Sequence, residues 1–281
     1  MTIAKLPLVL LCAGILPAAA TLTSCGGRIH HEESTGGAFR AVSEIYDVSR
    51  IYPGYNGSDS CSLNLSAQVE WPLEFGSADI KPLQAAISEL AFDNRSAGSV
   101  AAVLDSFLTS TDDYGLEIDN KEQGEPASMN PVAAYERQVS VSRGELTRDM
   151  VSYNIVDMSY MGGAHPNTYT RTFTYAFDPG VVLTPDNLFA ADSMSVVFEA
   201  INRQAAYRFE VQPGELTKAG LFDNIINVSP LVSLQDGMVV FHYNPYEIAP
   251  YSYGAIDITV APWEIEQALT SLGKRLLYVK E

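Results

Sequence analysis

A cluster of tyrosines beside one carboxylate is the part of this sequence best suited to binding chemistry. The cluster lies in a proline-bounded segment and consists of Tyr243, Tyr246, Glu247, Tyr251 and Tyr253. Tyrosine rings can stack on a sugar ring, and they serve equally well as anchors in protein interfaces. Because loops carry binding residues more often than regular elements do, we predict a ligand-binding site in this segment.

His165 and Asn167 form a second candidate segment, after the paired glycines at positions 162 and 163. Paired glycines followed by proline predict a turn or a bulged hairpin. Polar groups such as the Asn167 amide and the Glu247 carboxylate can hold the hydroxyls of a stacked sugar. In the alternative interpretation the tyrosines pack over a sheet edge, Glu247 accepts hydrogen bonds from loop amides, and His165 is only a turn residue.

The sequence offers little support for metal-dependent or nucleophilic catalysis. Imidazole and carboxylate groups suit zinc, which makes His165, His242 and Glu247 a conceivable set of ligands. The sequence has no closely spaced histidine pair, however, and we predict no metal site and no cofactor. It also has no GxSxG, P-loop, CxxC or HExxH motif, so no catalytic residue is assigned. A glycosidase stays open, because its carboxylate pair has no sequence signature.

Residues 1–24 have the pattern of a lipoprotein signal peptide. Lys5 precedes an uncharged apolar run that ends in LTSC at residues 22–25. This pattern predicts cleavage before Cys25 and lipidation of its thiol. The alternative interpretation is a retained transmembrane helix, because the run nearly reaches the roughly 20 residues that span a bilayer.

A lipidated Cys25 places the chain in the cell envelope, anchored by its lipid. Gly26 follows the cysteine in place of aspartate, which favours the outer membrane of a Gram-negative bacterium, on its periplasmic or its surface side. Residues 25–39 are rich in glycine and polar residues, and we expect a flexible tether there.

The chain is strongly acidic, with a net charge of −17. Cleavage before Cys25 removes Lys5 and no acidic residue, which changes the net charge to −18. Such a field repels nucleic acid and anionic lipid and attracts basic proteins at low salt. The plainer interpretation is a charged surface that keeps the protein soluble. Because 47% of the residues are hydrophobic, the chain can bury a sizeable core.

Hydrophobic periodicity predicts an α+β fold with mixed antiparallel sheets and packed helices, in a two-part module. The N-terminal part, residues 40–130, begins with a period-two strand over residues 62–71 that Pro72 is expected to end. Two amphipathic helices are predicted next, over residues 80–91 and 100–108. We expect an irregular acidic connection over residues 111–129.

The C-terminal part, residues 131–281, begins with predicted strands. These cover residues 135–143, 150–161 and 168–177. A helix over residues 195–209, a tight hairpin at Asp236 and Gly237, and a strand over residues 256–260 follow. Pro262 is expected to start one last helix, with Ile265, Ala268, Leu269 and Leu272 on its apolar face.

Two segments of the C-terminal part resemble signatures of the extracytoplasmic PdaC/RsiV-like family. The first is YMGGAHPN at residues 160–167, followed by LTPDNLF at residues 183–189, and the second is FHYNPYEIAPY at residues 241–251. The resemblance covers most of residues 42–273. Domains of this family accompany a membrane anti-sigma factor that binds lysozyme and a peptidoglycan deacetylase, and many members are lipoproteins.

The resemblance implies a two-part α+β module and does not imply deacetylation, because the deacetylase's metal-dependent domain is a separate unit. Together, the residues and the resemblance predict a non-catalytic binding module for cell-wall glycan or for a basic protein such as lysozyme. An envelope polysaccharide hydrolase and a structural assembly partner in the envelope are the alternatives. The expected ligand-binding residues are His165, Asn167, Tyr243, Tyr246, Glu247, Tyr251 and Tyr253.

Overall fold

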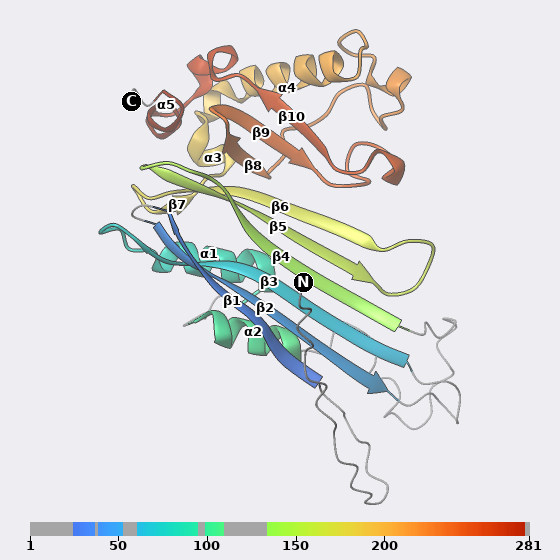
Figure 1. The fold of residues 1–281 in the computed structure, drawn as a ribbon. Helices are drawn as coiled ribbons and strands as arrows, with labels where there is room; N and C mark the ends of the chain where they lie inside the picture. The colour runs from blue at the N-terminus through green and yellow to red at the C-terminus, as the bar shows by residue number, and fades with distance from the viewer. Residues whose placement is uncertain (1–24, 37–38, 53–60, 95–98, 110–133, 279–281) are drawn as a thin grey trace, which may run out of the picture.

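The computed structural model describes residues 25–36, 39–52, 61–94, 99–109 and 134–278. They form a seven-stranded sheet, a three-stranded sheet and helices outside each sheet, so the predicted α+β class is confirmed (Figure 1). The predicted signal peptide and the acidic connection at residues 111–129 lie outside the described residues, as does the side chain of Cys25. None of the described helices is long and apolar enough to cross a bilayer.

The large sheet contains its strands in sequence order. They are β1 (Cys25–Gly36), β2 (Phe39–Tyr52), β3 (Cys61–Phe75), β4 (Ala134–Leu146), β5 (Met150–Tyr160), β6 (Asn167–Ala176) and β7 (Val181–Val182). All neighbours pair antiparallel except β3 and β4, which are parallel. Parallel neighbours need a long crossover, and α1 (Lys81–Phe92) and α2 (Val100–Thr109) lie within it.

Strand β3 follows the predicted alternation but continues beyond its predicted end. Leu63, Leu65 and Val69 are buried at alternate positions. Pro72 does not end the strand, because the register between β2 and β3 shifts between Arg40 and Ala41, opposite this proline. Such an irregularity is where a sheet tolerates a residue without a backbone N–H.

The two helices cover one face of the large sheet with the predicted apolar stripes. Leu83 and Ile87 of α1 and Leu104 of α2 are fully buried in a core shared with the sheet. Asp79 accepts a hydrogen bond from the N–H of Lys81 at 3.1 Å, as expected near a helix start. Residues of odd number in β3, β4 and β5 therefore form the sheet face that packs against these helices.

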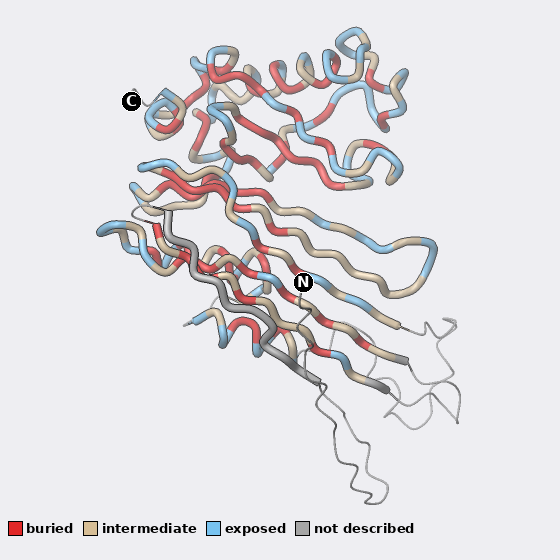
Figure 2. Tube along the Cα trace, in the orientation of Figure 1, coloured by how far each residue is buried: buried red, intermediate tan, exposed pale blue. Residues whose placement is uncertain are grey.

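The C-terminal elements form a second core. The small sheet has the order β10 (Ile256–Val260), β9 (Met238–Tyr243), β8 (Val232–Gln235). The helices around it are α3 (Pro185–Leu188), α4 (Met194–Arg208), α5 (Ser271–Leu277) and short 3₁₀ turns. Asp236 and Gly237 have positive φ, which confirms the predicted tight hairpin. Met150 and Ala176 of the large sheet belong to this second core, so β5 and β6 are covered on both faces at one end (Figure 2).

The last predicted helix is wrong as one continuous element. Pro262–Glu264 and Glu266–Ala268 are separate 3₁₀ turns, and α5 begins only at Ser271. Leu269 leaves the helical path because it forms an isolated β-bridge with Phe189. Thr270 is the N-cap of α5, and its hydroxyl accepts a hydrogen bond from the N–H of Gly273 at 3.2 Å.

The structure differs from two further expectations about the N-terminal part. Cys25–Gly36 is strand β1, paired antiparallel with β2, within the segment expected as a flexible tether. Pairing satisfies backbone groups along the outer edge of β2, a reason for order that composition does not reveal. The large sheet also crosses the expected boundary at residues 130 and 131, because β4 pairs with β3.

Candidate functional site

The tyrosine-rich loop is attached to the large sheet by the side chain of Asn244. Strand β7 pairs with β6 at Tyr175 and Ala176, and no other strand of the described residues pairs with that edge of β6. The Asn244 amide donates to the Thr170 carbonyl at 2.9 Å and accepts from the Thr170 N–H at 2.6 Å. Asn244 is itself 3% exposed, so this contact sets the loop at a defined place on the strand edge.

The turn between β5 and β6 meets the same loop. Gly162 and Gly163 have φ of 91° and 106°, a conformation that favours glycine. The turn brings the His165 ring onto the ring of Tyr251, with centroids 3.7 Å apart and an interplanar angle of 14°. The Tyr251 hydroxyl donates to the Pro166 carbonyl at 3.0 Å. The two segments that resemble the family signatures are therefore in direct contact.

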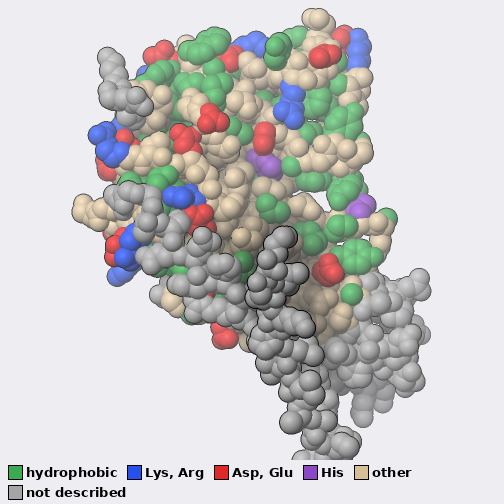
Figure 3. All heavy atoms as spheres, viewed as in Figure 1, with side chains coloured by type: hydrophobic (Ala, Val, Ile, Leu, Met, Phe, Trp, Pro, Cys, Tyr) green, Lys and Arg blue, Asp and Glu red, His purple; other side chains and the backbone are tan. Residues whose placement is uncertain are grey.

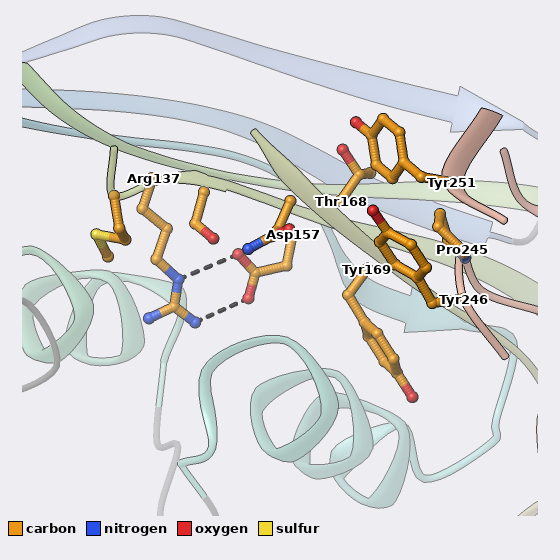
Figure 4. Close-up of a pocket in the computed structure, with 10 residues that line it drawn as sticks. Arg137, Asp157, Thr168, Tyr169, Pro245, Tyr246 and Tyr251 are labelled. Carbon is orange, nitrogen blue, oxygen red and sulfur yellow. Dashed lines mark hydrogen bonds and ion pairs between the residues drawn. The ribbon is translucent and has the colours of Figure 1, made fainter. Parts of the chain in front are cut away.

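An open cavity of about 430 Å³ lies between this loop and strands β4, β5 and β6 (Figure 4). Its lining combines charged, polar and aromatic side chains. They are Arg137, Asp157, Ser159, Met161, Asn167, Thr168, Tyr169, Pro245, Tyr246 and Tyr251. We call this space the tyrosine cavity.

One wall of the tyrosine cavity is an ion pair. Arg137 donates from Nε to one Asp157 oxygen at 3.1 Å and from Nη2 to the other at 2.8 Å. The two side chains are 18% and 16% exposed, and the guanidinium lies 5.3 Å from the Phe107 ring of α2. A bidentate pair whose guanidinium also packs on an aromatic ring is a rigid arrangement of hydrogen-bond donors and acceptors.

Exposed aromatic rings complete the lining: Tyr169 lies beside Asp157 on the neighbouring strand, and Tyr246 and Tyr251 come from the loop. Tyr169 is 41% exposed and carries the Arg171 guanidinium 4.7 Å from its ring centroid. Tyr246 is 56% exposed and has a φ of 70°, unusual for a residue other than glycine. Its ring lies 5.6 Å from that of Tyr251. The cavity therefore presents aromatic faces and an ion pair to one occupant.

The structure divides the sequence-predicted residues into two groups. Asn167, Tyr246 and Tyr251 line the tyrosine cavity, and His165 stacks behind Tyr251. The remaining three, Tyr243, Glu247 and Tyr253, do not line this cavity, and each makes a hydrogen bond to a backbone group.

Tyr243 is 4% exposed and donates to the Asn227 carbonyl at 2.6 Å. Burial, together with the nearby Glu247 charge, raises the pKa of Tyr243 above its ordinary value. Glu247 accepts a hydrogen bond from the loop N–H of Asn244 at 2.9 Å. Tyr253 donates to the Ala219 carbonyl at 2.5 Å. These contacts position the loop, and none of the three side chains lines the tyrosine cavity.

Sequence reasoning missed Arg137, Asp157 and Tyr169. The missed signal is a change of chemistry along one strand face: Val139 and Ile155 are buried against the helices, and the next positions on that face are Arg137 and Asp157. A charged residue at an inward position of a period-two strand indicates either a partner or a site.

The conceivable zinc ligands are not brought together. His242 lies on β9, where its Nδ1 is 2.6 Å from an Asp257 oxygen, whereas His165 stacks on Tyr251. The described residues contain no group of three or more His, Cys, Asp or Glu side chains placed to hold a metal ion.

Residues 186–264 match the family model of DUF3298, described as a protein of unknown function. The chain therefore contains a DUF3298 domain. The domain extends from α3 to the 3₁₀ turn after β10, and so includes the tyrosine-rich loop but not Arg137, Asp157 or Tyr169. A search of curated proteins finds no match to the chain.

Two crystal structures share the fold. A DUF3298 family member from Bacteroides fragilis has 18% sequence identity and a TM-score of 0.62, over 92% of this chain and 97% of that one. A DUF3298 family protein from Pseudomonas aeruginosa PAO1 also has 18% identity, with a TM-score of 0.53 over 82% of this chain and 94% of that one. Similarity at this level of identity shows a common architecture for the DUF3298 domain and the large sheet.

Proposed function

We propose that this protein is a lipid-anchored, extracytoplasmic binding module whose tyrosine cavity holds carbohydrate of the cell envelope. One observation carries the proposal. The exposed rings of Tyr169 and Tyr246 and the Arg137–Asp157 pair line the same open cavity. Sugar rings present apolar C–H faces and rows of hydroxyls, so a site of this class combines aromatic faces with paired donors and acceptors.

The charges within the cavity favour an uncharged sugar surface. Arg137 and Asp157 compensate each other's charge, and each Asp157 oxygen can accept a second hydrogen bond, from a ligand hydroxyl, beside the one it accepts from Arg137. Ser159, Asn167 and Thr168 add neutral hydrogen-bonding groups to the lining. A volume of about 430 Å³ falls within the range of small-molecule sites.

Binding without cleavage is the better-supported activity. Glycoside hydrolysis generally needs two carboxyl groups on either side of the scissile bond. Among the described residues that line the tyrosine cavity, Asp157 is the single carboxylate, and both its oxygens accept hydrogen bonds from Arg137. We therefore favour a binding module over an envelope polysaccharide hydrolase.

The proposed location depends on Cys25. The lipoprotein signal pattern supports acylation there, and the resemblance to the PdaC/RsiV-like family supports an extracytoplasmic domain. Cys25 is the first residue of β1 and pairs with Ser49 of β2. A lipid on this residue would hold one edge of the large sheet close to the membrane, because two or three acyl chains anchor stably.

A basic protein such as lysozyme is the competing ligand, favoured by the net charge of −17. On the face shown in Figure 3, acidic and basic side chains are interspersed and do not form one acidic field. A structural role in envelope assembly is the remaining alternative.

Isothermal titration calorimetry with soluble peptidoglycan fragments, and separately with lysozyme at two salt concentrations, tests the proposal. We expect the fragments to bind with little dependence on salt. Tyr246→Ala should weaken binding about tenfold, because a stacking contact on an aromatic ring is worth about 1 kcal/mol and about 1.4 kcal/mol corresponds to tenfold in Kd. Tyr207→Ala is the matched control, because Tyr207 is 82% exposed on α4 and does not line the cavity. No heat with the fragments, or equal loss in both variants, would remove the proposal.

A further inference from the structure

A second cavity lies on the other side of the tyrosine-rich loop. Its volume is about 230 Å³, and its lining includes Phe222, Asp223, Ile225, Tyr243, Glu247 and Ile248. The loop therefore supplies Tyr246 and Tyr251 to the tyrosine cavity, and Glu247 and Ile248 to this one. We call the second space the acidic-apolar cavity.

The backbone of the acidic-apolar cavity is held in place from several elements. Asn202 of α4 donates to the Ile226 carbonyl at 2.9 Å and accepts from the Ile226 N–H at 2.8 Å. The Phe222 N–H donates to the Ile248 carbonyl at 3.0 Å. The site is thus formed before any ligand arrives, which lowers the entropy cost of binding.

The rim exposes large apolar side chains. Phe222 is 49% exposed and Ile225 is 56% exposed, and both lie beside the cavity. Exposed aliphatic and aromatic groups that gather at one concave place indicate an interaction surface more often than scattered ones do.

Charge at the same place is of one sign. Asp223 and Glu247 line the cavity and are exposed, and none of its described lining residues is basic. The chain as a whole has a net charge of −17. A ligand that covers the rim must therefore bring apolar groups for Phe222 and Ile225 and a positive charge for the two carboxylates.

We propose that the acidic-apolar cavity docks a peptide segment of a partner protein in which an arginine or lysine stands next to an aliphatic residue. The methylene stem of the arginine or lysine covers apolar surface while its charged end reaches the carboxylates. This site shares no lining residue with the tyrosine cavity and does not depend on carbohydrate binding there.

The probe is a capped synthetic hexapeptide of alternating leucine and arginine, compared with one of alternating leucine and glutamate. Titrated into the isotopically labelled full chain, the arginine peptide should shift amide signals of residues 222–230 and 247–248 in a saturable way. The glutamate peptide should not. Three results overturn the proposal: saturable amide shifts that centre on Tyr246 and Tyr251, equal binding of the two peptides, or no amide shift at millimolar peptide.

Charge variants separate a specific site from general attraction. The double variant Asp223→Asn with Glu247→Gln keeps an acceptor for the Asn244 N–H and should weaken binding about fivefold. The control Asp192→Asn with Glu199→Gln changes the net charge equally at exposed positions outside the cavity, and should change binding less than twofold. Equal weakening in both double variants overturns the proposal.

The apolar half of the site has its own test. Phe222→Ser with Ile225→Ser should weaken the arginine peptide at least as much as the charge variant does, because the rim then offers less apolar area. Thermal unfolding of this variant checks that the fold is intact. Unchanged peptide binding in the folded variant contradicts the apolar contact and overturns the proposal.

Discussion

Asn244 and Thr170 are linked as two residues of neighbouring strands would be. The Asn244 side-chain amide exchanges two hydrogen bonds with the backbone N–H and C=O of Thr170, at 2.6 and 2.9 Å. An asparagine amide has the same donor and acceptor pair as a peptide group, so it satisfies an exposed strand edge without adding a strand. Through this contact the DUF3298 domain closes the edge of β6 and builds the tyrosine cavity beside it.

Replacing this amide should destabilise the fold. Asn244→Ala leaves the Thr170 N–H and C=O without these partners, and we expect the free energy of unfolding to fall by about 1–3 kcal/mol. Urea unfolding followed by circular dichroism measures it. Asn227→Ala is the matched control, because the Asn227 side chain is exposed and its contact to Tyr243 uses the backbone carbonyl. Equal stability of Asn244→Ala and the control would contradict the role given to Asn244.

The Arg137–Asp157 pair should be energetically coupled. In a double-mutant cycle with Arg137→Ala and Asp157→Ala, we expect a coupling free energy of about 1–2 kcal/mol, because the pair is bidentate and mostly buried. The exposed pair of Lys218 and Glu215, at 2.6 Å, is the comparison and should couple by about 0.5 kcal/mol or less. If the two cycles agree, the cavity wall is not the rigid feature inferred from its geometry.

Most elements of this fold could be predicted from local patterns. Strand β3, the stripes of α1 and α2, and the hairpin at Asp236 all follow from periodicity or turn chemistry. The extension of β3 past Pro72 could not, because it depends on a register shift in β2. The split of the last helix could not either, because Leu269 pairs with Phe189 from a different part of the chain.

The candidate site was only partly predictable for a similar reason. Tyr246 and Tyr251 stand out in the sequence as a cluster, and the structure places them together. Arg137 and Asp157 join them only because β4, β5 and β6 pair in one register and Asn244 brings the loop to that edge. No local pattern in the sequence encodes this approach. The sequence does place the charged residues Arg137 and Asp157 on strand faces that are otherwise apolar. That change of residue type is the signal that could have found this part of the site.

Glu264 should make stability depend on pH. Burial raises its pKa, but hydrogen bonds from Arg203 and Gln204, both at 2.8 Å, outweigh burial and leave the pKa below the ordinary value of 4.5. A carboxyl with a lowered pKa stabilises the fold above its unfolded pKa and loses that contribution as pH falls through the folded pKa. Glu264→Gln should therefore cost about 1–2 kcal/mol at pH 7 and nothing near pH 2.

Unfolding of wild type and Glu264→Gln in urea, from pH 7 down to pH 2, measures this dependence. Glu215→Gln is the control, because Glu215 makes an exposed ion pair and should change stability little at any pH. If the difference in the free energy of unfolding between wild type and Glu264→Gln stayed constant below pH 4, the lowered pKa of Glu264 would be contradicted.

Gly220 should not tolerate a side chain, because of Tyr253. The Tyr253 hydroxyl donates to the Ala219 carbonyl, and a Cβ on Gly220 would collide with that hydroxyl. Gly220 also has a φ of 88°, so Gly220→Ala should lower the free energy of unfolding by about 2–3 kcal/mol. Gly76→Ala is the matched control. Gly76 has a φ of 53°, and a Cβ added there would have no atom within 4 Å, so only the backbone strain of about 1 kcal/mol applies.

Adding Tyr253→Phe to Gly220→Ala should recover part of the lost stability, because the colliding oxygen is removed while the backbone strain remains. No recovery in that double variant, measured by thermal unfolding, would show that backbone conformation alone requires the glycine.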